Sequence, residues 1–204
     1  MLLYLVTVLF LALTSFLEIL QAYLQKNCYN IAVMNMKIEK IVVGELKENC
    51  YVVINNKNEA LVIDPGDEAK RILEFLKPYH VVGILVTHHH FDHIGALEEL
   101  NSVYSLIENQ VSSTDFLFDT IATPGHTDNS VSFAFSELGC VFVGDFIFKD
   151  GIGRTDLGGD EMRMKLSLKH FLEQFSDDTV LYPGHGEATT FGRERKFLEN
   201  WIKM

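Results

Sequence analysis

The stretch THHHFDHIG, Thr87–Gly95, holds four of the eight histidines of this 204-residue chain and follows directly on the apolar run GILV. Residues two apart in an extended segment share a face, so His88 and His90 can reach one point together. His93 lies one helical turn beyond His90, so Asp92 and His93 can point to a neighbouring position. The stretch therefore predicts either a polar turn or half of a metal site, depending on what other segments supply.

Three other predicted strands end in the same way. TIATP is followed by His126, CVFVG by Asp145 and TVLYP by His185, each beside a glycine that permits a tight turn. If these strands end at one edge, seven potential ligands converge there: His88, His90, Asp92, His93, His126, Asp145 and His185. That set is large enough for two metal ions, each with an open position for water.

The remaining histidines lack such a placement. His89 points away from His88 and His90, so we expect it behind the ligands or in solvent, and we expect His80 and His170 at the surface.

The hydrophobic pattern predicts an α/β protein in which two sheets pack together with helices outside. Strands are expected at 37–44, 50–56, 60–66, 83–87, 120–124, 130–135, 140–145 and 179–184, and helices at 67–79, 94–101, 160–175 and 193–203. Phe146 and Phe148 are expected in the core.

Composition excludes some classes of function. Hydrophobic residues make up 48% of the chain, and 28 acidic against 17 basic residues give a net charge of −11, which disfavours nucleic acid as a partner. Cys28, Cys50 and Cys140 are few and far apart, which fits a reducing compartment and buried thiols rather than disulfides.

An apolar extension, residues 1–33, precedes the predicted globular domain at 34–204. Three interpretations stay open: a natural start at Met34 or Met36, a membrane anchor in which residues 2–24 insert, or a packed helix. Lys26 on the C-terminal side of an inserted segment would keep the domain in the cytoplasm, so we expect a cytoplasmic protein with or without a membrane tether.

The motifs together resemble those of the metallo-β-lactamase superfamily. They are THxHxDH at 87–93, TPGHT at 123–127, GD at 144–145 and YPGHG at 182–186, with IDPGD at 63–67. IGRTDLGGD at 152–160 and the closing GHGEATTFGRER resemble the small glyoxalase II-like (hydroxyacylglutathione hydrolase-like) enzymes. The resemblance covers about Met36 to Trp201 and implies a four-layer αββα sandwich of two mixed sheets.

The resemblance also implies roles for the ligands. One divalent metal ion would take His88, His90 and His126, the second would take Asp92, His93 and His185, and Asp145 would bridge them. Zinc is the favoured ion, with iron and manganese as alternatives.

The implied enzyme is a dinuclear hydrolase in which a metal-bridging hydroxide attacks an activated acyl group, a thioester of the hydroxyacyl-glutathione type. Asp92 and Asp145 would orient the hydroxide and relay a proton. Arg154 and Tyr182 are candidate contacts to this small-molecule substrate. Pairing of Arg154 with a local carboxylate is the favoured interpretation, and simple packing of Tyr182 stays open as the alternative.

Other functions stay open. A mono-iron persulfide dioxygenase shares the histidine motif, and a lactone or ester hydrolase shares the whole site. A dizinc β-lactamase is disfavoured because Asp145 stands where those enzymes have a cysteine. A purely binding role is disfavoured because none of the seven ligands is lost.

Overall fold

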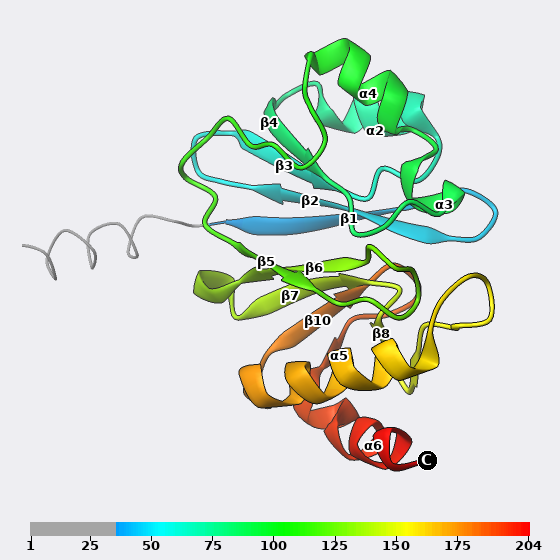
Figure 1. Cartoon of the computed structure of the whole chain (residues 1–204). Helices are drawn as coiled ribbons and strands as arrows, with labels where there is room; N and C mark the ends of the chain where they lie inside the picture. Colours follow the sequence, from blue (N-terminus) through cyan, green and yellow to red (C-terminus); the bar gives the residue numbers. More distant parts are fainter. Residues whose placement is uncertain (1–35) are drawn as a thin grey trace, which may run out of the picture. The chain divides into compact units, whose positions relative to one another are not determined.

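The computed structural model of the protein describes residues 36–204 (Figure 1). The predicted extension 1–33, its three interpretations and Cys28 lie outside the described residues. Between residues 36 and 204, no helix combines the length and the apolar character that crossing a bilayer requires.

The first sheet has the strand order β1-β2-β3-β4. Its strands are β1 (Lys37–Val43), β2 (Glu48–Ile54), β3 (Glu59–Ile63) and β4 (His80–Leu85). The first three strands are antiparallel neighbours, whereas β3 and β4 run parallel because helix α2 (Ala69–Leu76) connects them.

The second sheet has the order β11-β10-β7-β6-β5. Its strands are β5 (Asp119–Ala122), β6 (Val131–Phe135), β7 (Cys140–Gly144), β10 (Val180–Pro183) and β11 (Thr189–Thr190). A short helix η1 (Ser136–Leu138) links β6 to β7. Strands β7 and β10 are parallel, and between them lie the hairpin of β8 (Ile147–Phe148) and β9 (Gly151–Ile152) and helix α5 (Glu161–Gln174).

Alternating side chains explain why the sheets pack face to face. Along β2, Tyr51 and Val53 belong to the core between the sheets, whereas Cys50 and Val52 face the helices on the outer side. Both faces of β2 are therefore buried, which accounts for its nearly continuous apolar sequence. From the second sheet, Phe142 reaches the shared core; a fully buried side chain of this size contributes about 2 to 3 kcal/mol to folding.

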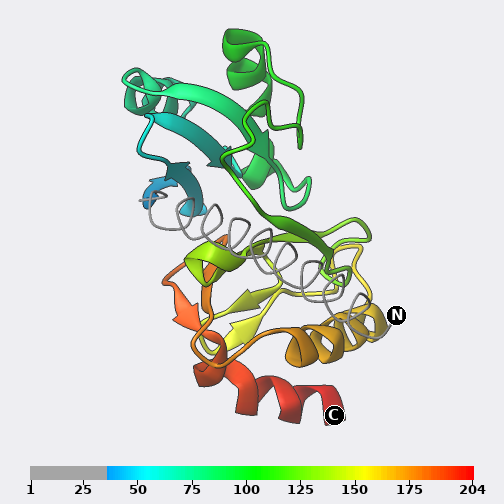
Figure 2. The same ribbon diagram turned by 90° about the vertical axis from the view of Figure 1, so that its left-hand side faces the viewer.

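Helices cover the two outer faces and complete four layers (Figures 1 and 2). Helix α2 and helix α4 (Leu97–Tyr104) pack on the first sheet, while α5 and α6 (Phe191–Lys203) pack on the second. The Asp160 side chain accepts a hydrogen bond from the Arg163 N–H and so caps the start of α5. The predicted αββα sandwich of two mixed sheets is confirmed.

One predicted element differs. In place of a single helix over 94–101, the chain forms a short helix α3 (Phe91–Ile94) and then α4. The break occurs where the loop after β3 packs closely. The Ala96 N–H donates to the carbonyl of Pro65, and a Cβ on Gly95 would lie 2.3 Å from the carbonyl oxygen of Gly66. Asp92 and His93 therefore lie on the separate short helix α3 and not on one helix together with residues 97–101.

The two described cysteines, Cys50 and Cys140, are buried and free, as expected. Burial raises the pKa of the Cys140 thiol to about 12. Both behave as small hydrophobic residues of the core.

Candidate metal centre

The structure brings all seven predicted ligands to one edge of the two sheets. His88 and its neighbours follow β4 of the first sheet. His126, Asp145 and His185 follow strands β5, β7 and β10 of the second sheet. The site is therefore assembled from loops of both sheets, held by the core between them.

Three imidazoles form the first cluster. The Nδ1 atom of His90 lies 3.1 Å from Nε2 of His88 and 2.8 Å from Nε2 of His126. His88 and His126 are buried, whereas His90 is partly exposed, so the cluster is closed on the protein side and open toward solvent.

A second cluster contains Asp92, His93 and His185. Asp92 Oδ2 lies 3.2 Å from Nε2 of His185. Asp145 sits between the clusters: its Oδ1 lies 3.3 Å from Nε2 of His93, and its Oδ2 lies 3.6 Å from Nε2 of His126. One carboxylate can therefore contact ions on both sides.

The donor atoms fit divalent cations. Nε2 of His93 and Oδ1 of Asp145 are buried, yet neither has a hydrogen-bond partner among the described residues. Buried polar atoms without a partner are costly unless something binds them. Three-donor groups of imidazole nitrogen and carboxylate oxygen suit zinc, iron or manganese.

Burial and neighbouring charges set the protonation of the ligands. Burial, followed by the adjacent imidazoles, lowers the pKa of His88 to about 2, and burial also lowers the pKa of His90. Both rings are therefore neutral and keep a lone pair for a cation. Although burial alone raises the pKa of Asp145, its contact with His93 lowers it to about 2, so this carboxylate is ionised.

Residues 43–108 and 106–185, more than half of the chain, match the family model described as the metallo-beta-lactamase superfamily. The chain belongs to this superfamily.

Three named proteins are similar to this chain over most of its length. Hydroxyacylglutathione hydrolase GloC of Haemophilus influenzae is 28% identical over 79% of this chain and 96% of its own length. The BLEG-1 B3 metallo-beta-lactamase has a TM-score of 0.75 at 29% identity, covering 79% of this chain and 99% of that one. TTHA1623, solved in a di-iron-bound form, has a TM-score of 0.69 at 29% identity, covering 78% and 97%.

In this superfamily member, Asp64 supports the ligands from behind. Its carboxylate accepts hydrogen bonds from the N–H and the Oγ1–H of Thr87, both at 2.7 Å, and lies 3.0 Å from Nδ1 of His93. Although burial by itself lowers the pKa of His93, the contacts with Asp145 and Asp64 raise it to about 11. Asp64 belongs to the IDPGD motif, but the sequence does not indicate that it contacts Thr87 and His93.

Two backbone carbonyls orient further ligands. Nδ1 of His126 lies 2.7 Å from the carbonyl oxygen of Arg154, and Nδ1 of His185 lies 3.1 Å from that of Leu46. Each contact leaves Nε2 free to face the cluster. The sequence could not reveal these partners, since every residue carries the same carbonyl group.

Glu48 is a further buried acid that sequence reasoning missed. Its Oε1 lies 3.9 Å from Nδ1 of His93, and neither of its oxygens has a hydrogen-bond partner among the described residues. Burial, followed by the charge of Asp64, raises the pKa of Glu48 to about 10, so this side chain is neutral near pH 7.

Gly184 makes the close packing of the ligands possible. A Cβ at this position would lie 2.5 Å from both Oδ1 of Asp145 and Cε1 of His93. At Gly144, the backbone φ of +50° and the approach of Thr87 likewise exclude a side chain.

The other predicted residues differ in their placement. His89, His80 and His170 are exposed, and His89 lies 3.0 Å from Glu108. Arg154 lines the cavity above the ligands, but its Nε and an Nη atom donate to the two oxygens of Asp156, both at 2.7 Å. The favoured interpretation of a local pair therefore describes its side chain.

Two aromatic residues require correction. Tyr182 does not line the cavities at the metal centre; it packs between the sheets, stacked on Phe142 at 5.1 Å and edge-on to Tyr51. Its position in β10, one residue before the turn, directs it inward. Phe146 is buried as expected, but Phe148 lines the cavity beside His185, because the unpredicted hairpin β8–β9 turns it toward the site.

Proposed function

We propose that the protein is a dinuclear metal-dependent hydrolase of acyl thioesters. The observation that carries this proposal is the position of Asp145, whose two oxygens face different ligand clusters. A substrate of the hydroxyacyl-thiol type is supported by the similarity to hydroxyacylglutathione hydrolase GloC.

His88, His90 and His126 would hold one ion, Asp92, His93 and His185 would hold the other, and Asp145 would contact both. Two divalent ions held by these residues would lower the pKa of a water molecule and polarise an acyl carbonyl. Zinc is our proposed ion, and the similarity to TTHA1623 makes iron the alternative.

The reaction consumes one water. The water oxygen forms a bond to the carbonyl carbon, the bond between that carbon and sulfur breaks with its electron pair going to sulfur, and the two protons of the water end on the thiol and the carboxylic acid. A thiolate is a good leaving group, so no serine or cysteine nucleophile is required.

The residues of the chain orient the water and move its proton. Asp92 is partly exposed at the floor of the cavity, where its carboxylate can accept a proton from the water and return it to the departing sulfur. Asp145 is ionised and would accept a hydrogen bond that orients the water. Asp64 keeps His93 in place throughout.

Metal analysis with matched activity assays tests the proposal. Full-length protein is purified without chelators, and its metal content is measured alongside hydrolysis of S-lactoylglutathione, S-acetyl-N-acetylcysteamine, a lactone and a β-lactam. About two ions per chain with thioester hydrolysis supports the proposal. One iron per chain with oxygen uptake on a persulfide would establish the dioxygenase instead. No bound metal after reconstitution would overturn both.

A further inference from the structure

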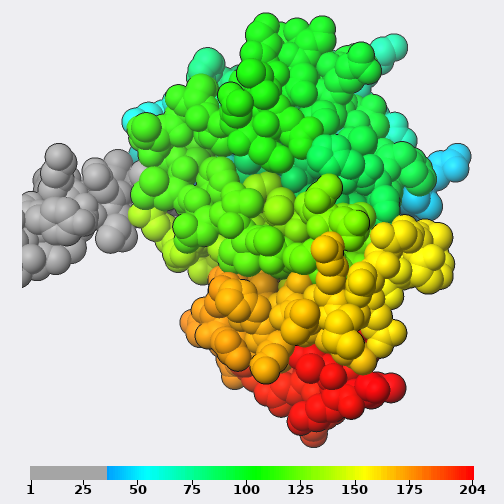
Figure 3. Space-filling model, viewed as in Figure 1, coloured from blue at the N-terminus to red at the C-terminus, as the bar shows by residue number. Residues whose placement is uncertain are grey.

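Three large apolar side chains surround the opening of the metal centre. Leu46, Phe91 and Leu157, together called the apolar rim, are 54%, 74% and 58% exposed. They come from the β1–β2 turn, the start of α3 and the loop after β9. In Figure 3 the yellow loop lies directly below the blue turn at one border of the molecule.

The apolar rim lines the same cavity as the ligands. This cavity of about 530 Å³ is bounded by the rim together with His90, Asp92, His126, Asp145, Arg154 and His185. Isolated apolar side chains on a surface are ordinary, but three that converge on a cluster of metal ligands form a binding wall. A substrate held at the candidate ligands would have these side chains beside it.

The wall continues away from the metals. Leu46 and Phe91 also line a second cavity of about 430 Å³, which reaches Val43, Gly44 and Gly66 and ends at Asp67. Both cavities have Leu46, Phe91 and Asp92 in their linings, so they are neighbours on either side of these residues, and together they are called the groove.

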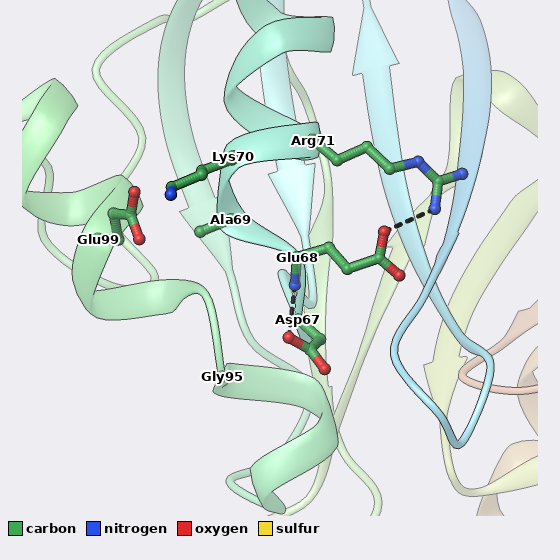
Figure 4. A pocket seen from close by; sticks show the side chains of 7 residues that line it. All are labelled: Asp67, Glu68, Ala69, Lys70, Arg71, Gly95 and Glu99. Atoms are coloured by element: carbon green, nitrogen blue, oxygen red, sulfur yellow. Dashed lines mark hydrogen bonds and ion pairs between the residues drawn. The ribbon is translucent and has the colours of Figure 1, made fainter.

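The groove stops at a charged hollow beyond Asp67, shown in Figure 4. There Arg71 turns to Glu68, 2.9 Å away, and Lys70 extends toward Glu99. The apolar part of the groove thus lies between the metals and Asp67.

Two cations near the metal centre are paired with carboxylates, whereas Lys40 donates to the carbonyl of Gly186, 3.0 Å away, and has no carboxylate partner among the described residues. Arg154 is held by both oxygens of Asp156, and Lys149 is paired with Glu187. The unpaired charges lining the groove are those of carboxylates, Glu45 and Asp67 among them. A thiol that carries carboxylates, as glutathione does, would meet like charge along the lining of this groove.

We propose that the apolar rim binds an uncharged hydrocarbon substituent of the substrate. The hydrolase therefore prefers thioesters that carry a hydrocarbon chain next to the scissile bond over thioesters of charged thiols. The proposal rests on the proposed thioester hydrolysis. The chain can belong to the acyl group or to the thiol, because either side of the scissile bond can lie along the groove.

Two substrate series distinguish these sources. In the first, N-acetylcysteamine is the constant thiol and the acyl group grows from acetyl to octanoyl. In the second, lactoyl is the constant acyl group and the thiol is butanethiol, N-acetylcysteamine or glutathione. If the rim binds the acyl group, we expect kcat/KM to rise about two- to fourfold per methylene in the first series; if it binds the thiol, we expect the butanethiol thioester to be hydrolysed about two- to fourfold faster than the N-acetylcysteamine thioester in the second. Glutathione is expected to be the poorest thiol.

Serine substitutions test the rim itself. The double variant Leu46→Ser and Leu157→Ser is expected to reduce the octanoyl-to-acetyl (or butanethiol-to-N-acetylcysteamine) ratio of kcat/KM at least fivefold. The substitution preserves the Leu46 carbonyl that His185 contacts. Leu117→Ser is the matched control, since Leu117 is 56% exposed and lines neither cavity of the groove. Metal content and the unfolding midpoint confirm that each variant is folded.

Hydrolysis that is independent of chain length in both series, or fastest with glutathione, would overturn this inference while leaving the proposed function intact. A double variant that keeps the wild-type ratio would also overturn it. Absence of hydrolysis of every thioester by metal-loaded enzyme would instead refute the proposed function.

Discussion

Oδ1 of Asp145 lies 3.3 Å from Nε2 of His93, and neither atom has a hydrogen-bond partner within residues 36–204. A carboxylate and an imidazole that face each other at this distance without bonding leave room for a shared ion. Asp145→Asn keeps the shape and removes the charge. We expect bound metal to fall and hydrolysis to drop at least about 100-fold, measured by elemental analysis and kcat.

The control for Asp145→Asn is His89→Ala, because His89 belongs to the same motif but is exposed and paired with Glu108. It should keep metal and activity. An Asp145→Asn protein with both ions and full activity would contradict the bridging role.

Asp64 supplies a second test, because it acts only through its neighbours. Asp64→Asn replaces one carboxylate oxygen by an amide that cannot accept from both Thr87 and His93. We expect metal affinity to fall about 10- to 100-fold, as measured by titration with a competing chelator. Asp119→Asn, at an exposed strand position, should leave the affinity unchanged. Equal affinities in the two variants would show that Asp64 has no part in holding His93.

Gly184 tests the packing around the ligands. In Gly184→Ala, the new methyl group would displace Asp145 or His93, so we expect loss of metal and of activity while the sheets remain folded. Gly151→Ala is the matched control, since nothing lies within 4 Å of a Cβ there. Circular dichroism and metal analysis separate the two effects. A fully loaded Gly184→Ala protein would mean that the loop relaxes freely.

Asp156 masks the positive charge of Arg154. We expect Asp156→Asn to free that charge and to raise kcat/KM for S-lactoylglutathione about two- to fivefold relative to S-lactoyl-N-acetylcysteamine, in keeping with the modest energy of an exposed pair. Arg154→Gln should leave this ratio nearly unchanged. A large loss in Arg154→Gln, specific to the glutathione thioester, would show that Arg154 already binds the substrate.

Burial makes Cys140 unreactive in the native protein. With its pKa raised to about 12, about one thiol in 10,000 is ionised at pH 8, and only the thiolate reacts. Iodoacetamide followed by peptide mapping should leave Cys50 and Cys140 unmodified until denaturant is added. Rapid native labelling of Cys140 would contradict the packing of β7.

Strand-end chemistry made the convergence of the candidate ligands predictable. His88, His126 and His185 each follow an apolar run, and a polar residue at such a point lies at a sheet edge whatever the details of packing. Strands β2 and β7 were equally predictable, because a strand that is buried on both faces has a nearly continuous apolar sequence.

The supporting contacts were not predictable, for physical reasons. The carbonyls that orient His126 and His185 are backbone groups, which have no sequence signature. Tyr182 resembled a pocket residue from its place beside the YPGHG turn, but strand register directs it into the core. Phe148 was assigned to the core by alternation with Ile147, and the two-residue strand β8 is too short for that pattern to be reliable.

The division of the ligands between two sheets has a consequence for synthesis on the ribosome. The first cluster needs His126 from the second sheet, and the second cluster needs His185, far later in the chain. A partly translated chain therefore exposes isolated imidazoles that bind cations weakly and reversibly. Tight binding of the metal ions requires that both sheets have been translated and packed. In the proposed enzyme, a molecule that retains its ions is therefore completely folded.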